Sequence, residues 1–200
     1  DSRLLPIHYA CALQPPPDVI AALSSIHLDG LASRESYFGR MPLHVACLKN
    51  SSLQCIHELL RPYPMACLVQ DRFGRLPLHY ALSNGAPFEV VQELVDTSPM
   101  SARIKEKNGW LPLHVACHMG MSDSILLLLL DAYPNGAIAR NRRGLPPKVP
   151  TELLEEHLDR HQLDYDALSS TDSSKSDDDQ GHHRIDITRP YQPILQAYIA

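Results

Sequence analysis

Histidine and cysteine recur three residues apart in this 200-residue chain. The pairs are His8 with Cys11, His44 with Cys47, and His114 with Cys117. Side chains three apart share one face of a helix, so this spacing can bring two metal ligands together or place a histidine beside a catalytic thiol. In a further copy of the same phrase, Leu82 stands in the cysteine position. Leucine cannot bind a metal, so we expect the cysteines to form an inward-facing apolar column without zinc or catalysis.

Other catalytic signatures are few. The chain contains no H-E-x-x-H, no G-x-S-x-G and no glycine-rich phosphate loop. His182 and His183 stand together in a polar segment, where histidines are usually solvated. The carboxylates are scattered, and those such as Asp18 and Glu89 are expected on the faces of outer helices. We therefore expect no enzymatic activity, no metal and no cofactor.

The phrase around each histidine is periodic. It reads MPLHVAC from Met41, LPLHYAL from Leu76 and LPLHVAC from Leu111, with a looser copy, LPIHYAC, from Leu5. The prolines that open the copies are Pro6, Pro42, Pro77, Pro112 and Pro147, and all but the first follow a glycine three residues earlier: Gly39, Gly74, Gly109 and Gly144. A second set of prolines keeps the same period: Pro64, Pro99 and Pro134. The chain is thus an array of units of 35 or 36 residues.

Each unit predicts a glycine turn, a short inner helix, a break, a longer outer helix and a loop. Proline opens the inner helix, where the missing N–H has no partner to lose. The outer helix carries an apolar stripe with a period of 3.6, such as Val90, Val91, Leu94 and Val95. Two such helices cannot bury their apolar faces alone, so neighbouring units must stack into one continuous core.

The phrase and its period resemble the ankyrin repeat family, whose units carry T-P-L-H-x-A. The resemblance covers Leu4 to about Leu163 and implies an all-α fold. The expected architecture is an ankyrin-like solenoid of stacked helix-turn-helix repeats with turn fingers, followed by an extended C-terminal tail. The resemblance also implies that the histidine links neighbouring turns by hydrogen bonds. Leu or Met replaces the family threonine, so apolar packing should replace its hydroxyl, and the loop before each finger is about two residues longer.

The ends of the array set the predicted boundaries. Residues 1–163 are assigned to about four repeats, with a degenerate fifth repeat and a capping helix from residue 144. Pro150 prevents an inner helix in that fifth repeat. The array starts within a repeat, so we expect it to continue upstream.

The C-terminal part of the chain divides into two predicted segments. Residues 164–181 form an acidic Ser/Asp-rich linker, and residues 182–200 form an apolar docking peptide. The residues expected to dock, on the array itself or within an assembly, are Ile187, Tyr191, Ile194, Leu195 and Tyr198.

A stack of this kind presents its fingers and the exposed side of its inner helices as one concave binding face. This face is predicted to be both basic and aromatic, a composition typical of binding hot spots. The expected partner-binding residues are Tyr37, Phe38, Arg40, Lys49, Arg72, Phe73, Arg75, Lys107, Trp110, His118, Met119, Arg142 and Arg143. The alternative is that the arginines are merely solvated and that Phe38 and Phe73 pack against the adjacent finger.

Charge and cysteine content narrow the partners and the compartment. Up to Pro147 the chain has 13 Lys and Arg against 12 Asp and Glu, and after it 5 against 11. An array so close to neutrality argues against nucleic acid as the partner. Five cysteines without tight pairs favour an intracellular, reducing compartment. The longest apolar run, from Ile125 to Leu130, is far shorter than the roughly 20 residues of a membrane span.

The leading hypothesis is a non-enzymatic protein–protein interaction scaffold. It would bind an acidic or amphipathic protein segment through the finger and inner-helix face, and the C-terminal peptide would add a second contact. Two alternatives remain open at this point. The chain could be a structural subunit of a large multiprotein assembly, or the regulatory ankyrin fragment of a larger enzyme.

Overall fold

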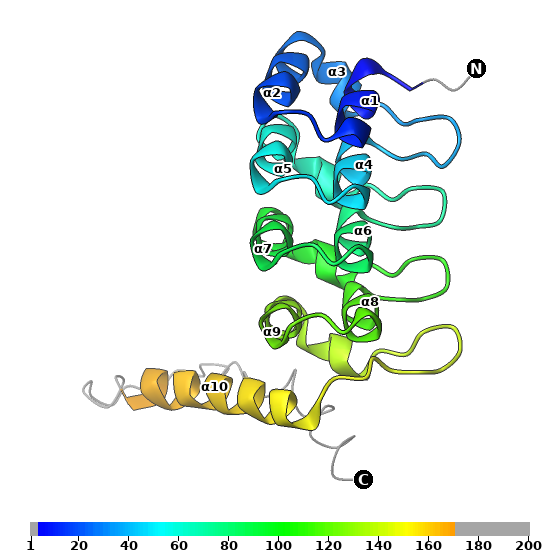
Figure 1. Ribbon diagram of the computed structural model, residues 1–200. Coiled ribbons are helices and arrows are strands. Elements are labelled where there is room, and N and C mark those ends of the chain that lie inside the picture. The colour runs from blue at the N-terminus through cyan, green and yellow to red at the C-terminus, as the bar shows by residue number, and fades with distance from the viewer. Residues whose placement is uncertain (1–3, 171–200) are drawn as a thin grey trace, which may run out of the picture.

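The computed structural model describes residues 4–170, with side chains through residue 160. Over this range the chain forms ten α-helices and three 3-10 helices and contains no strand, which confirms the all-α prediction. Figure 1 shows two parallel columns of helices with four loops projecting on one side. The helices α1, α4, α6 and α8 form the inner column, and α2, α5, α7 and α9 form the outer column.

Each inner helix begins at the proline of its phrase. Their bounds are Pro6–Leu13 for α1, Pro42–Leu48 for α4, Pro77–Ser83 for α6 and Pro112–Met119 for α8. The outer helices are α2 (Pro17–Ile26), α5 (Leu53–Leu60), α7 (Phe88–Thr97) and α9 (Asp123–Ala132). Each helix contacts its partner in the same repeat and the equivalent helix of the next repeat. The stacking expected from the apolar periodicity is therefore the observed packing.

The second set of prolines opens short 3-10 helices rather than plain loops. These are η1 (Pro64–Leu68), η2 (Pro99–Arg103) and η3 (Pro134–Ile138), while the first repeat has the short helix α3 (Leu28–Leu31) at this place. The sequence predicted a longer loop here, and the added residues instead complete a helical turn. The turn buries Ala66, Ala102 and Ala137 against the core.

The core is one continuous apolar cluster along the stack. Ile20, Ile56, Val91 and Leu126 hold the same position in successive outer helices, and all four are buried. Met41, Leu76 and Leu111, which replace the family threonine, are also buried. Apolar packing at the turn thus takes the place of the missing hydroxyl, as expected from the sequence.

The four projecting loops are called fingers 1 to 4, formed by residues 34–40, 70–75, 105–110 and 140–145. A backbone hydrogen bond closes the base of each finger, as from Asp71 N to Arg75 O at 2.9 Å. Backbone bonds also join neighbouring fingers: Arg72 N to Phe38 O, Lys107 N to Phe73 O, and Arg142 N to Asn108 O, at 2.8 to 3.0 Å. The fingers therefore form one connected edge rather than four independent loops.

In α4, α6 and α8 the phrase histidine fastens the inner helix to two turns, whereas His8 of α1 contacts only the carbonyl oxygen of Arg40, at 3.3 Å. His44 Nδ1 accepts from Met41 N at 3.1 Å, and the opposite ring nitrogen, Nε2, lies 3.1 Å from the carbonyl oxygen of Arg75 in the next finger. His79 and His114 repeat both contacts one and two repeats further on. Because Nδ1 accepts, the ring is neutral with its proton on Nε2, which donates to the carbonyl.

The C-terminal end of the stack is covered by α10 (Thr151–Ser170). No inner helix forms in the fifth repeat, as Pro150 predicts. Leu153 and Leu154 are buried, and α10 contacts α9. Figure 1 shows α10 crossing beneath the last repeat toward the outer column. Residues 164–170, which were predicted from the sequence to belong to the linker, form the last part of this helix.

Candidate functional site

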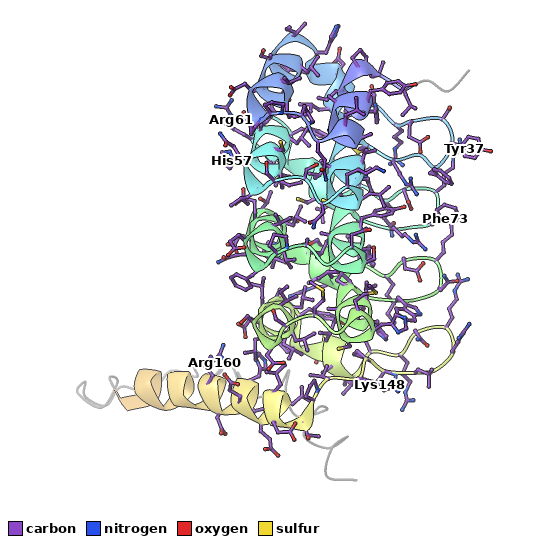
Figure 2. The ribbon with its side chains drawn as sticks, viewed as in Figure 1. Tyr37, His57, Arg61, Phe73, Lys148 and Arg160 are labelled. Carbon is purple, nitrogen blue, oxygen red and sulfur yellow. The ribbon has the colours of Figure 1, made fainter. Side chains whose placement is uncertain are left out.

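Fingers 1 and 2 carry an aromatic cluster, formed by Tyr37, Phe38 and Phe73. The ring centroids lie 5.1 Å apart for Tyr37 and Phe38, and 5.9 Å apart for Phe38 and Phe73. Phe38 and Phe73 thus do pack between adjacent fingers. Tyr37 nevertheless remains 75% exposed and Phe73 42% exposed, and Figure 2 shows both at the outer rim of the fingers. The cluster therefore packs adjacent fingers together and leaves aromatic surface exposed.

Arg40 is half-buried and contacts side chains of two repeats. Its guanidinium lies 4.2 Å from the centroid of the Phe38 ring, and its Nε donates to the hydroxyl oxygen of Tyr80 at 3.1 Å. The Tyr80 hydroxyl donates in turn to Asp71 Oδ2 at 2.6 Å. Burial and the bond to Asp71 raise the pKa of Tyr80 above its ordinary value. Arg40, expected on the exposed face, is half-buried because this network holds it between two repeats.

A cavity of about 460 Å³ opens over fingers 2 to 4. Its walls come from three fingers, and its floor comes from the inner helices α6 and α8. The lining residues are Arg75, His79, Ser83, Glu106, Asn108, Trp110, Val115, Arg142 and Arg143. Four of the residues predicted to bind a partner, Arg75, Trp110, Arg142 and Arg143, are thus brought together from sites up to 68 positions apart in the chain.

The cavity is basic, and its one carboxylate is engaged by the finger backbone. Glu106 Oε1 accepts from the backbone N–H groups of Asn108 and Trp110 at 2.9 and 3.4 Å. Burial lowers the pKa of His79 to about 4, so this histidine is neutral near pH 7. The net charge of the lining is therefore positive and comes from its three arginines.

Trp110 forms an aromatic wall of this cavity. Its ring lies 5.3 Å from the ring of His118 in an edge-on arrangement, and 6.1 Å from the ring of His114. The indole is half-buried. It is the only tryptophan of the chain, so a bound group in the cavity would change the environment of a single indole.

The remaining predicted residues lie on exposed surface around the cavity and the cluster. Arg72 and Lys107 are exposed in fingers 2 and 3, and Arg72 Nη1 donates to the Tyr37 carbonyl oxygen at 3.1 Å. Lys49 and Met119 are exposed at the C-terminal ends of α4 and α8. These residues do not line the cavity.

One set of residues that shape the fingers was not predicted from the sequence: the polar groups buried inside them. They are Glu35, Asp71, Glu106 and Asn141, and each accepts hydrogen bonds from backbone N–H groups of its own finger. The expectation that the scattered carboxylates lie on outer helices was wrong for Glu35, Asp71 and Glu106, because finger backbones require acceptors. Their spacing of 35 or 36 residues was the available signal.

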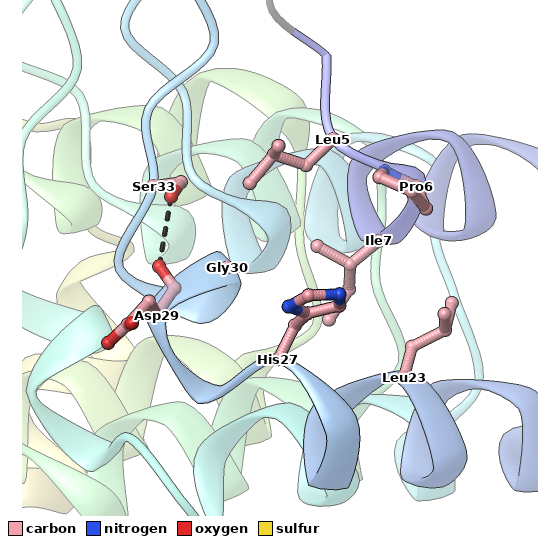
Figure 3. A pocket seen from close by; sticks show the side chains of 8 residues that line it. All are labelled: Leu5, Pro6, Ile7, Leu23, His27, Asp29, Gly30 and Ser33. Atoms are coloured by element: carbon pink, nitrogen blue, oxygen red, sulfur yellow. Dashed lines mark hydrogen bonds between the residues drawn. The ribbon is translucent and has the colours of Figure 1, made fainter.

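A second, smaller hollow lies at the first repeat (Figure 3). Its volume is about 160 Å³, and Leu5, Ile7 and Leu23 supply apolar walls. Leu59, Leu94 and Leu129 hold the position of Leu23 in later repeats and are buried. Ser33 Oγ donates to the Asp29 carbonyl oxygen at 2.9 Å within the hollow. The lining is mostly apolar, and Asp29 is its one carboxylate.

The cysteines are placed as packing residues. Cys11, Cys47, Cys55 and Cys67 are buried and Cys117 is half-buried, all as free thiols. Burial raises the pKa of Cys11 and Cys67 to about 12 and that of Cys117 to about 11, which makes the reactive thiolate rare. Among the side chains that the structure describes, no group of three His, Cys, Asp or Glu could hold a metal ion.

The fold and this face define a class of protein: an α-helical solenoid of stacked helix pairs with projecting fingers. A family model described as ankyrin repeats in three copies matches residues 7–98 and 43–138. The chain belongs to the ankyrin repeat family. No protein in a search of the curated proteins matches it.

Two further predictions concern membranes and the tail. From residue 4 to residue 170, no helix has both the length and the apolar character needed to cross a bilayer. The proposed docking residues Ile187, Tyr191, Ile194, Leu195 and Tyr198 lie outside the described residues.

Proposed function

We propose that the chain is a non-enzymatic scaffold that binds a protein segment through the face formed by its fingers and inner helices. Ankyrin repeats are in general protein-interaction modules. The observation that carries the proposal is the joint presence, on one rigid edge, of the aromatic cluster and the basic cavity. Aromatic residues and arginine dominate the energetics of protein interfaces, and the connected fingers hold them in place before binding.

The electrostatics favour an acidic or amphipathic segment as the bound partner. The cavity lining carries three arginines against one buried carboxylate that the finger backbone already uses. An arginine that meets a carboxylate across an interface adds both specificity and association rate. The exposed rings of Tyr37 and Phe73 offer apolar contact on fingers 1 and 2, next to the cavity on the same edge, because Arg75 of the cavity lies 5.6 Å from the centroid of the Phe73 ring.

The test is affinity capture with the full chain and two matched pairs of variants. Tyr37→Ser with Phe73→Ser changes the finger face, and His57→Ser with Arg61→Ser changes the outer column on the opposite side (Figure 2). We expect quantitative mass spectrometry to find a protein retained by the native chain and the outer-column variant and lost by the finger variant. Proteins lost equally from both variants, or from neither, would contradict the proposal.

A further inference from the structure

The cavity over fingers 2 to 4 contains cationic groups without protein partners. The side chains of Arg142 and Arg143 have no ion pair or hydrogen bond to any described residue; only their backbone N–H groups do. The ion pairs given for the described residues lie elsewhere: Arg61 with Glu58 in α5, Asp131 of α9 with His157 and Arg160 of α10, and Arg160 with Glu156 within α10. Two exposed guanidinium groups at one cavity rim, unneutralised, provide a site for an anion.

The third arginine of the cavity is positioned from the opposite rim. Arg75 belongs to finger 2, and its guanidinium lies 5.6 and 5.7 Å from the ring centroids of Phe73 and Tyr80. The aromatic faces orient it without neutralising its charge. An anion in the cavity therefore meets cations from finger 2 on one side and finger 4 on the other.

We infer that this cavity binds the carboxylate side chain of an acidic peptide segment in a partner protein, with Trp110 packing on the apolar part of that segment. The inference rests on the proposed function and adds which chemical group of the partner the cavity binds. Arginine matches a carboxylate with two parallel hydrogen bonds. Glu106 lines the same cavity, and its charge opposes a dianionic phosphate more strongly than a singly charged carboxylate.

The acidic run of the chain itself, Asp177 to Asp179, cannot be this occupant within the same molecule while α10 is intact. The 20 residues of α10 span about 30 Å and lead away from the fingers (Figure 1). The residues from Ser170 to Asp177 reach back at most about 25 Å when fully extended.

Trp110 makes the inference directly measurable, because the chain has no other tryptophan. The probe is the peptide Gly-Ser-Leu-Glu-Glu-Leu-Ser-Gly, titrated into the full chain while indole emission is recorded. The controls are the same peptide with Gln-Gln and with two phosphoserines in place of Glu-Glu. We expect saturable binding of the Glu peptide that is at least about tenfold tighter than that of the Gln peptide, and that weakens as salt is added.

Paired variants tie this signal to the cavity. Arg142→Gln with Arg143→Gln should weaken binding of the Glu peptide by about tenfold or more. Arg61→Gln with Arg103→Gln removes the same charge outside the cavity and should leave the affinity within about twofold. Circular dichroism and the urea midpoint verify that each variant is folded.

Three peptide-binding results would overturn the inference: equal affinity for the Glu and Gln peptides, unchanged binding in the Arg142 and Arg143 variant, or phosphoserine binding more than about tenfold tighter than Glu. A self-association that disappears when Asp177 to Asp179 become asparagine would assign the cavity to a second copy and also overturn it. If finger-dependent capture persists while the Glu peptide fails to bind, the carboxylate assignment fails and the proposed function survives. Failure of capture as well removes both.

Discussion

At the scale of single residues, the neutral histidine of the repeated phrase links neighbouring repeats by hydrogen bonds. Its ring accepts a hydrogen bond from the turn before its own helix and donates one to the next finger, as His79 does between Leu76 N and Trp110 O. The resemblance to ankyrin repeats predicted this role from the letters alone. The buried acceptors Glu35, Asp71 and Glu106 were not predicted, because carboxylates are exposed in most proteins and the periodic glycines mark the finger turn without showing which side chain accepts from its backbone.

Because these histidines are buried in their neutral form, the protein should lose stability in mild acid. Burial lowers the pKa of His44 and of His79 from 6.5 to about 4. The unfolded chain therefore takes up protons first as the pH falls, so this stabilisation is full above pH 6.5 and disappears progressively between 6.5 and 4. Moving from pH 7 to pH 5, each of these histidines should lower the free energy of unfolding by about 2 kcal/mol.

Urea unfolding at pH 7 and pH 5 measures this loss. The variant with His44→Gln and His79→Gln should be less stable at pH 7 and should lose less than the native chain on moving to pH 5. An equally steep pH dependence in the two proteins would show that these histidines are not the titrating groups.

At the scale of elements, the fingers depend on glycines that perform unequal tasks. Gly109 and Gly144 both have positive φ, +80° and +75°, which disfavours any side chain. A Cβ at Gly109 would lie 2.8 Å from the backbone nitrogen of Arg142 in the next finger, whereas a Cβ at Gly144 would meet nothing within 4 Å. Close contact between fingers thus constrains the first glycine and not the second.

Alanine at the two glycines separates backbone strain from finger contact. Gly144→Ala should cost about 1–2 kcal/mol, the strain of a left-handed alanine. Gly109→Ala should cost at least about 1 kcal/mol more, because it also displaces the bond from Arg142 N to Asn108 O. Urea denaturation of both variants measures the difference, and equal losses would contradict the close packing of fingers 3 and 4.

Helix starts and finger turns were predictable because proline and glycine restrict the backbone locally. The 3-10 helices were not, because five residues such as Pro64–Leu68 are too few for an apolar period to appear. The stacking of successive repeats in chain order was also predictable, because it follows from the repeat period. The cavity did not, since its lining joins side chains from fingers 2, 3 and 4 whose directions only the assembled stack determines.

At the scale of the whole molecule, contacts are made between neighbouring repeats, so the effects of a change should fade along the stack. Replacing Leu153 and Leu154 by aspartate in the full chain would detach α10 from α9. We expect hydrogen exchange to show protection in α9 falling by at least about tenfold, with α4 unchanged.

Exposed residues of the same helix supply the control for this experiment. Glu152→Asp with Glu155→Asp changes two residues of α10 that are exposed and should leave protection in α9 as it is. A uniform loss of protection from α1 to α9 in the leucine variant would indicate a single cooperative unit instead.

One further row of hydrogen bonds joins the first residues of successive fingers. Arg34 donates to the Gln70 carbonyl oxygen, Gln70 to that of Lys105, and Lys105 to that of Arg140, at 2.7 to 3.1 Å. Three different side chains thus reach the same kind of acceptor, the main chain of the following unit. Every repeat has this main-chain acceptor, whatever its side chains. Duplication or loss of an entire internal repeat would therefore leave equivalent hydrogen bonds between the repeats that become neighbours. Such an array can grow or shrink by gene rearrangement without inventing a new junction.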